Sequence, residues 1–407
     1  MSARLAGRSA LLAALATIWA VAAYLLWQSK VPSSLHLPHL DPHTYFTAAE
    51  LHATASFSRV NELIFWGTTL IQIAALAAYA RWGIRWSRES AAGPLGTGML
   101  LGMLGFALVW AVELPFGVLD LWWQRRHNLS SVGYLTYLFG DWFSLGGQFV
   151  FLCFALAIVM GFARKLGDRW WIAAAPLFVG LALLFAFISP YLTPTHRLHD
   201  PGLRAAATRF EAKDHVGNVP IDVATVHDIT SLPNAEAMGV GPSRRVVLWD
   251  TLVDGRFSRP ELRIVIAHEL GHLARSHIWK AVGWYALFAF PGAFLIGRVT
   301  RRRGGMGNPE AVPLSLVALV VLGLLSLPLE NAISRHREAE ADWIALQTTH
   351  DPAAATALFR RFVPTTLGAP SPSTLDYLLL ENHPTIMQRI AMAQAWRAQA
   401  TSAAQSP

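Results

Sequence analysis

Charged residues are scarce in this sequence, and cysteine is almost absent from it. Only 14% of the 407 residues are Asp, Glu, Lys or Arg, whereas 53% are hydrophobic. Soluble globular domains carry roughly 25% charged residues, so this composition excludes an ordinary soluble enzyme and indicates a multi-pass membrane protein. The net charge of +7 comes mainly from arginines between apolar runs, which is typical of membrane topology and gives no support for nucleic-acid binding. Cys153 is the single cysteine, so an intrachain disulfide is excluded.

Seven apolar runs are long enough to cross a bilayer, each with about 18 or more residues and few charges. They comprise residues 9–27, 63–80, 95–112, 143–162, 170–188, 278–296 and 312–329. The first run lacks a convincing small-residue cleavage site and further spans follow it, so it is predicted to be a retained helix. We therefore predict a mainly α-helical, integral multi-pass protein in contact with the lipid bilayer.

Two polar blocks interrupt and follow these runs, and the chain divides accordingly. We predict an N-terminal five-helix membrane region over residues 1–192 and spans six and seven over residues 278–330. The first part of a second domain covers residues 193–277, and its second part covers residues 331–397. A disordered tail is predicted over residues 398–407. In the first block, β-branched segments predict two strands of a small sheet. These strands cover residues 219–226 and 245–253. Helices are predicted over residues 330–349, from Asp351-Pro352 onward, and over residues 385–397.

The first polar block ends with a His-Glu-x-x-His motif that predicts a metal site. Two histidines four residues apart on a helix project from one face, so His268 and His272 can bind one zinc ion. Glu269, between them, can then take a proton from a water activated by the metal. Ser258 and Glu261 have the spacing of a capping box, which predicts that the helix begins just before the motif.

A catalytic zinc ion needs a third protein ligand, and Glu338 is the best candidate. Two spans separate it from the histidines, and two spans form a hairpin that returns the chain to the same membrane face. Asp342 lies one helical turn beyond Glu338, where it can accept the second ring proton of a ligand histidine. The alternative is a solvated helix face on which these carboxylates pair with Arg335 and Arg337.

Several motifs together resemble the type I CAAX prenyl protease family, whose members are integral-membrane zinc metalloendopeptidases of the gluzincin type. The resemblance runs from about residue 45 to residue 393 and rests on His268-Glu269-Leu-Gly-His272 with His277, on Asn331-x-x-Ser334-Arg335-x-x-Glu338-x-x-Ala341-Asp342, and on His383-Pro384 ahead of Arg389. Seven spans, with the motif before the sixth, also agree with that family. Smaller stress-induced bacterial membrane peptidases share the motifs but have fewer spans.

The resemblance implies a fold and a catalytic apparatus. Seven helices would enclose an intramembrane chamber, with a small α+β metallopeptidase domain over its catalytic mouth. His268, His272 and Glu338 would hold one zinc ion per chain, and Glu269 would be the general base. His383 would hydrogen-bond the oxyanion of the tetrahedral intermediate. On sequence alone, a turn ordered by the following proline accounts for this histidine equally well.

The resemblance also implies how a peptide or protein substrate binds. Asn234 and Ala235 would lie on an edge strand that pairs with the substrate backbone. The chain departs from the family pattern at Glu236, Ala339 and Thr385, where the family has two aromatic residues and a second proline. These positions concern the substrate groove and not the zinc ligands, so recognition of a prenyl group is left open.

Three alternatives remain for the function. The chain could be a quality-control membrane protease without prenyl specificity. It could be a transporter or receptor with a structural metal, but transport places ionisable groups mid-membrane, and Gln72 and Gln148 are the main polar residues in the seven runs. It could also cleave within the membrane, but only six apolar residues precede His268, with Arg263 and Arg275 on either side. The motif is therefore predicted to lie at or outside the interface.

The side of the membrane on which the motif lies is open. Arg and Lys are densest at the N-terminus and in the second, fourth and sixth loops, which the positive-inside rule places in the cytoplasm. The polar blocks would then face outward. The eukaryotic members of the family are expected to face the cytosol.

Overall fold

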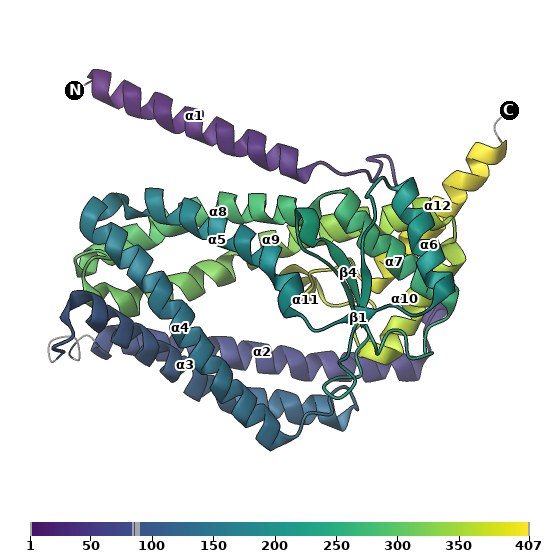
Figure 1. Cartoon of the computed structure of the whole chain (residues 1–407), viewed down its shortest axis with the longest axis horizontal. Coiled ribbons are helices and arrows are strands. Elements are labelled where there is room, and N and C mark those ends of the chain that lie inside the picture. The colour runs from purple at the N-terminus through teal and green to yellow at the C-terminus, as the bar shows by residue number, and fades with distance from the viewer. Residues whose placement is uncertain (1, 84, 86–89, 406–407) are drawn as a thin grey trace.

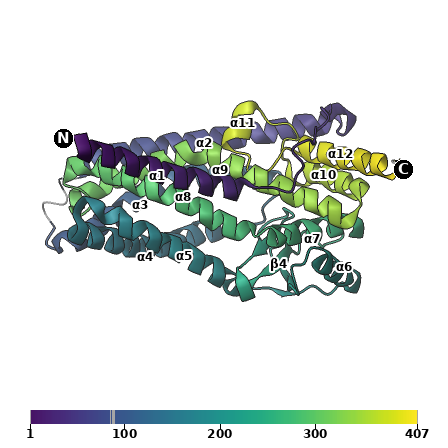
Figure 2. The same ribbon diagram turned by 90° about the horizontal axis from the view of Figure 1, so that it is seen from above.

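Long helices lie along the longest axis of the molecule, and a small sheet with shorter helices lies at one end of them (Figure 1). The structure is a computed structural model that describes residues 2–83, 85 and 90–405. Successive long helices alternate in direction, and both the N-terminus and the turn between α8 and α9 lie at the end remote from the sheet (Figures 1 and 2). The polar blocks of the sequence therefore gather at a single end of the helical bundle.

The seven predicted apolar runs all lie in helices of this bundle. These are α1 (Ser2–Trp27), α2 (Ala48–Trp82), α3 (Gly93–Arg126), α4 (Tyr134–Leu166), α5 (Trp170–Leu192), α8 (His277–Thr300) and α9 (Val312–Thr349). By length and composition, five segments of the described chain can cross a membrane: Ala48–Trp82, Gly93–Arg126, Tyr134–Leu192, His277–Arg303 and Pro309–Thr349. The third of them contains both α4 and α5, and the apolar part of α1, Ala13–Trp27, is shorter than a full span.

Several bundle helices extend well beyond their apolar runs. Helix α2 begins at a capping box, in which the Thr47 N–H donates to the Glu50 carboxylate at 2.8 Å, about four turns before the run predicted at residues 63–80. Helix α3 continues through Pro115 to its end at Arg126. The loop that follows α3 contacts the loop before β3, where Ser130 and Thr230 form an isolated bridge.

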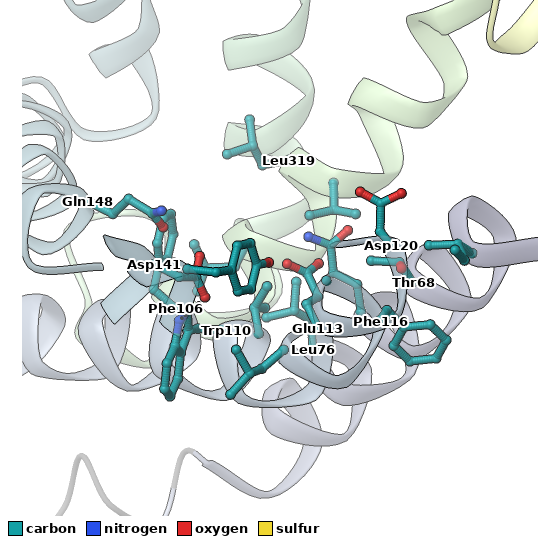
Figure 3. A pocket seen from close by; sticks show the side chains of 18 residues that line it. Thr68, Leu76, Phe106, Trp110, Glu113, Phe116, Asp120, Asp141, Gln148 and Leu319 are labelled. Carbon is teal, nitrogen blue, oxygen red and sulfur yellow. Dashed lines mark hydrogen bonds between the residues drawn. The ribbon is translucent and has the colours of Figure 1, made fainter. Parts of the chain in front are cut away.

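A cavity of about 470 Å³ lies between α2, α3, α4 and α9. Its lining combines apolar side chains such as Phe106 and Leu319 with the carboxylates of Glu113, Asp120 and Asp141 (Figure 3). These carboxylates lie just outside the apolar runs predicted from the sequence, on the polar extensions of α3 and α4. The cavity is thus lined by four of the bundle helices and is partly polar.

The sheet has four strands in the order β1-β2-β4-β3, comprising β1 (His196–Arg197), β2 (Ile221–Ala224), β3 (Ala235–Met238) and β4 (Arg245–Trp249). Strands β2 and β4 are parallel, and they confirm the two strands predicted from β-branched residues. Strand β3 is antiparallel to β4 and lies at the edge of the sheet. Side chains of β2 and β4 join a hydrophobic core with helices α6 (Pro201–Lys213) and α7 (Arg259–Ala274).

Helix α7 carries the His-Glu-x-x-His motif and begins where the sequence predicts. The Glu261 carboxylate accepts from the Ser258 N–H at 2.6 Å, which closes the first turn, and it also pairs with Arg361 at 2.9 Å. Glycine at position 271 lets α7 approach α9 closely, because a Cβ there would lie 3.3 Å from Ile344. The two helices that carry the candidate metal ligands are therefore in direct contact.

Helix α9 is one continuous helix of 38 residues. The sequence predicts two separate elements here, a span ending at residue 329 and a helix over residues 330–349, and that division is wrong. Glu338 thus lies on the same helix as the last membrane span. The predicted domain boundary after residue 330 falls within this helix and stays a prediction.

The C-terminal block is helical, as predicted, but its tail differs. It contains α10 (Pro352–Thr366), α11 (Thr374–Leu379) and α12 (Ile386–Gln405). The N-cap Asp351 accepts from the Ala354 N–H at 2.9 Å, which confirms the predicted start of α10. The tail at 398–407, predicted to be disordered, continues α12 to Gln405, because its Ala- and Gln-rich sequence favours helix. Short 3-10 helices occupy Pro42–Thr44, Gly167–Arg169, Gly241–Ser243, Arg301–Arg303 and Pro309–Ala311.

Candidate active site and metal centre

Helices α7 and α9 bring His268, His272 and Glu338 together. The Nε2 atoms of the two histidines are 3.1 Å apart. Carboxylate oxygens of Glu338 lie 3.2 Å from the His268 Nε2 and 3.5 Å from the His272 Nε2. Among the described residues, this is the group of three His, Cys, Asp or Glu side chains whose ligand atoms all lie within 4.8 Å of one another.

The spacing of these atoms fits a metal ion. In a tetrahedral zinc site with bonds of about 2.0 Å, the ligand atoms are roughly 3.3 Å apart, and the three distances lie close to that value. The chemistry agrees, since the two Nε2 atoms face each other while each ring has a further partner at its Nδ1. Two lone pairs facing at 3.1 Å repel unless a cation lies between them.

A buried carboxylate orients His268. The Nδ1 of His268 lies 2.9 Å from Asp342, which accepts its proton and leaves Nε2 free to bind a metal. Arg389 donates to both oxygens of Asp342, at 2.8 and 2.7 Å, and packs over the Phe359 ring at 4.2 Å. Burial lowers the pKa of His268, but the hydrogen bonds to Asp342 and Glu338 outweigh that effect and raise the pKa above its ordinary value.

A second chain of hydrogen bonds orients His272. The Nδ1 atoms of His272 and His277 are 2.8 Å apart, and the His277 Nε2 lies 2.9 Å from Glu340. Because Glu340 can only accept, His277 donates to it through Nε2–H and accepts the proton of His272 at Nδ1. The Nε2 of His272 is then free to bind a metal, as it is in His268. Arg275 and Lys280 neutralise Glu340 at 2.7 and 3.2 Å.

The two predicted catalytic side chains border the metal-ligand candidates. Glu269 is buried, and it lines two cavities that both include His268. His383 comes from the loop before α12, is about half exposed, and has its Nε2 3.2 Å from Glu338. Its Nδ1 lies 2.7 Å from Asn382. Both side chains can therefore reach a substrate bound between the cavities.

The free edge of β3 faces the same cavities. The Asn234 carbonyl accepts from the Trp249 N–H at 2.9 Å, so this carbonyl points toward β4. Because backbone groups alternate along an antiparallel strand, those of Ala235 and Ala237 point toward the free edge. The exposed Asn234 can therefore contribute its side chain, whereas Ala235 offers its backbone.

Two cavities flank these residues. One, of about 280 Å³, is lined by β3, the histidines and the start of α8: Ala235, Glu236, Ala237, His268, Glu269, His272, His277, Ile278, Ala281, Arg337, Glu338 and His383. The other, of about 90 Å³, shares Ala235, His268, Glu269 and His383 but is otherwise mostly apolar, with Leu252, Ile264, Val265, Leu358, Phe359 and Phe362. A substrate on β3 would thus meet a polar cavity and an apolar one.

Sequence reasoning missed part of this arrangement. It gave no orienting role to His277 or Glu340 and did not identify the backbone of Ala237. Asp342 could be found because it lies one turn from Glu338, whereas Glu340 lies on another face of α9 and meets α8. Two features of the sequence could have indicated these roles. His277 lies five residues after His272, and Glu340 lies two residues after Glu338.

The fold and site define a membrane-embedded metallopeptidase. The chain belongs to peptidase family M48, whose model matches residues 194–397, about half of the chain. A metalloprotease named YhfN from Bacillus subtilis strain 168 is 25% identical over 401 residues, covering 91% of this chain and 92% of the relative. Protease HtpX homolog 2 from Methanosarcina mazei is 37% identical over 129 residues, which cover 30% of this chain and 43% of that relative.

A solved structure has the same fold over nearly the whole chain. The crystal structure of Ste24p from S. mikatae superposes with a TM-score of 0.69 and 17% sequence identity. The match covers 93% of this chain and 96% of that one. The protein is therefore a multi-pass integral membrane metalloprotease with the helical architecture seen in Ste24p.

Proposed function

We propose that this protein is a zinc endopeptidase that hydrolyses peptide bonds at the membrane surface. The convergence of His268, His272 and Glu338 at the spacing of a tetrahedral site carries this proposal. Zinc bound there would supply a Lewis acid that polarises the scissile carbonyl and makes water acidic near neutral pH. Glu269 would remove the proton of the attacking water and deliver it to the leaving amine. His383 would donate a hydrogen bond to the oxyanion.

The substrate would bind as an additional strand on β3. The outward N–H and C=O groups of Ala235 and Ala237 offer backbone hydrogen bonds to an extended peptide. Asn234 would add a side-chain contact at the end of that strand. Because both flanking cavities share Glu269, they would receive side chains on either side of the scissile bond, and the apolar one suits a small aliphatic residue.

Two substrate classes are compatible with the comparisons. Trimming of prenylated C-termini is supported by the structural match to Ste24p over 93% of the chain and by the partly apolar cavity between the bundle helices. Degradation of unlipidated membrane proteins is supported by the similarity of the peptidase block to HtpX homologues. Mass analysis of products from matched prenylated and unprenylated peptides separates the two classes.

Substitution of Glu269 tests the reaction itself. Glu269→Gln should lower kcat by at least about a thousandfold, since it removes the base, while metal content stays near one zinc per chain. Glu338→Ala should instead lose the metal. The measurements are cleavage of a membrane-protein substrate and metal analysis of the purified protein.

The matched control lies on the same helix as Glu338. Glu330→Gln changes an exposed carboxylate of α9 and should leave both metal content and cleavage as in the wild type. Wild-type activity in Glu269→Gln would exclude the proposed base. Full zinc content in Glu338→Ala would exclude that residue as a ligand.

A further inference from the structure

Glu236 is a carboxylate in the site cavity that the proposed reaction does not use. It lies in the middle of edge strand β3, opposite Val247 of β4, and lines the 280 Å³ cavity with His277 and Glu269. Its side chain is partly buried. No hydrogen bond or ion pair to this carboxylate comes from any of the described residues.

Three other buried carboxylates near the site are each paired with an arginine. Their partners lie within 2.7–2.9 Å: Arg361 at Glu261, Arg275 at Glu340 and Arg389 at Asp342. A partly buried charge without such a partner is unfavourable, because it loses water and gains no compensating contact. Burial and the nearby Glu269 accordingly raise the pKa of Glu236. A positive group that binds in the cavity would supply the missing partner.

The chain itself offers no cation to Glu236 within the described residues. Arg337 lines the same cavity, but its guanidinium donates to the His277 carbonyl at 3.3 Å and makes no ion pair with Glu236. The guanidinium belongs to the α9 side of the cavity, whereas Glu236 belongs to the β3 side. Arg337 and Glu236 therefore line the cavity from different elements, and no ion pair joins them.

We propose that Glu236 is a specificity-determining residue that binds a lysine or arginine side chain of the substrate. This rests on the proposed pairing of the substrate with β3. Directly opposite residues of paired strands project from the same face, with Cβ atoms about 4.5–5.5 Å apart. The substrate residue opposite Glu236 therefore places its side chain next to this carboxylate. An acidic residue at that position would be rejected by Glu236 and Glu269 together.

The test uses the purified full-length enzyme and a peptide that the wild type cleaves and Glu269→Gln does not. Basic, neutral and acidic versions of this peptide are made by placing Lys, Gln or Glu singly at each position that flanks the scissile bond. The kcat/KM of each version is then measured. At one position, the wild type should prefer Lys to Glu by about tenfold or more. Glu236→Gln should bring that ratio close to one, and Glu236→Lys should invert it.

A matched control removes the same charge elsewhere. Asp228→Asn alters an exposed side chain, 87% accessible, and should keep the wild-type ratio. Glu236→Asp keeps the charge and should retain a preference for Lys, which separates charge from folding. The proposal is overturned if the wild type shows no preference for Lys at any position, or if the preference persists in Glu236→Gln.

A preference for Glu would also overturn the proposal, and would assign recognition to Arg337 instead. Failure of the proposed function would give a different result. The wild type would then cleave no peptide, or Glu269→Gln would cleave as well as the wild type. If the wild type cleaves the peptides but shows no preference for Lys, only the proposed role of Glu236 is refuted.

Discussion

His277 connects a candidate metal ligand to a carboxylate that is almost entirely inaccessible to solvent. The Glu340 carboxylate fixes the proton of His277 on Nε2, and His277 in turn fixes the proton of His272 on Nδ1. Asp342 does the same for His268 directly. Both ligand candidates are therefore held as the tautomer that presents Nε2 to the metal, one through a single acceptor and the other through two side chains in series.

Replacement of His277 should therefore weaken metal binding. His277→Ala removes the acceptor for the His272 Nδ1–H, and loss of such an outer partner typically lowers metal affinity 10–100-fold. The affinity can be measured by competition with a zinc chelator. His383→Ala serves as the contrast, because it should abolish most activity and keep the metal. Equal zinc affinity in His277→Ala and the wild type would contradict the orienting role.

At the level of single residues, the spacing of the sequence predicted which side chains lie close together, but not the directions in which backbone groups point. The i, i+4 relationships of one helix bring His268 to His272 and Glu338 to Asp342, so both pairs could be anticipated. The convergence of the two helices followed from the parity of the spans. Spacing could not show that the Asn234 carbonyl is occupied by Trp249, because that depends on the register between β3 and β4.

At the level of elements, the contact between α7 and α9 holds the site together, and Gly271 lies at this contact. A Cβ added there would lie 3.3 Å from Ile344 and 3.5 Å from the Cα of Ala341. Gly271→Ala should change the free energy of unfolding by less than about 1 kcal/mol, since the higher helix propensity of alanine offsets the close contact. Gly271→Val has no space for its two methyl groups and should destabilise by about 1–3 kcal/mol.

The measurement for this pair is thermal unfolding together with zinc titration. Gly271→Val should lower both Tm and zinc affinity, because separation of the helices moves Glu338 away from the histidines. Gly271→Ala is the matched control at the same position. A normal zinc affinity in a destabilised Gly271→Val would show that the site does not depend on this contact.

Element boundaries were the least predictable feature of the fold. The change from apolar to charged residues after Leu329 was interpreted as the end of a helix, but helix formers continue on both sides of it. Pro328 does not interrupt α9, since it lies inside the helix. Strand β3 is only four residues long and contains two alanines, so its composition carried little signal for a strand.

At the scale of the whole molecule, the arginine cluster Arg301–Arg303 and the candidate active site lie at opposite ends. Arg301–Arg303 form the turn between α8 and α9, at the end of the bundle that also holds the N-terminus (Figure 1). The sheet and α7 lie at the other end. The spans could be predicted because composition alone marks them, whereas the four-helix lining of the cavity depends on packing that composition does not encode.

The orientation of the molecule can be tested with cysteine labelling. In a Cys153→Ser background, the positive-inside rule predicts that Arg302→Cys is protected from a membrane-impermeant maleimide in intact cells and labelled after permeabilisation. Asp254→Cys, at the sheet end, should be labelled in intact cells. The reverse pattern would place the catalytic end in the cytoplasm.

The separation of the candidate ligands along the chain has a consequence for biosynthesis. The ribosome completes the two histidines of α7 before it makes α8, and Glu338 follows only in the second half of α9. A nascent chain therefore holds an incomplete ligand set until its last two spans have entered the bilayer. We therefore expect a partly inserted copy, which lacks Glu338, to be unable to hydrolyse neighbouring proteins.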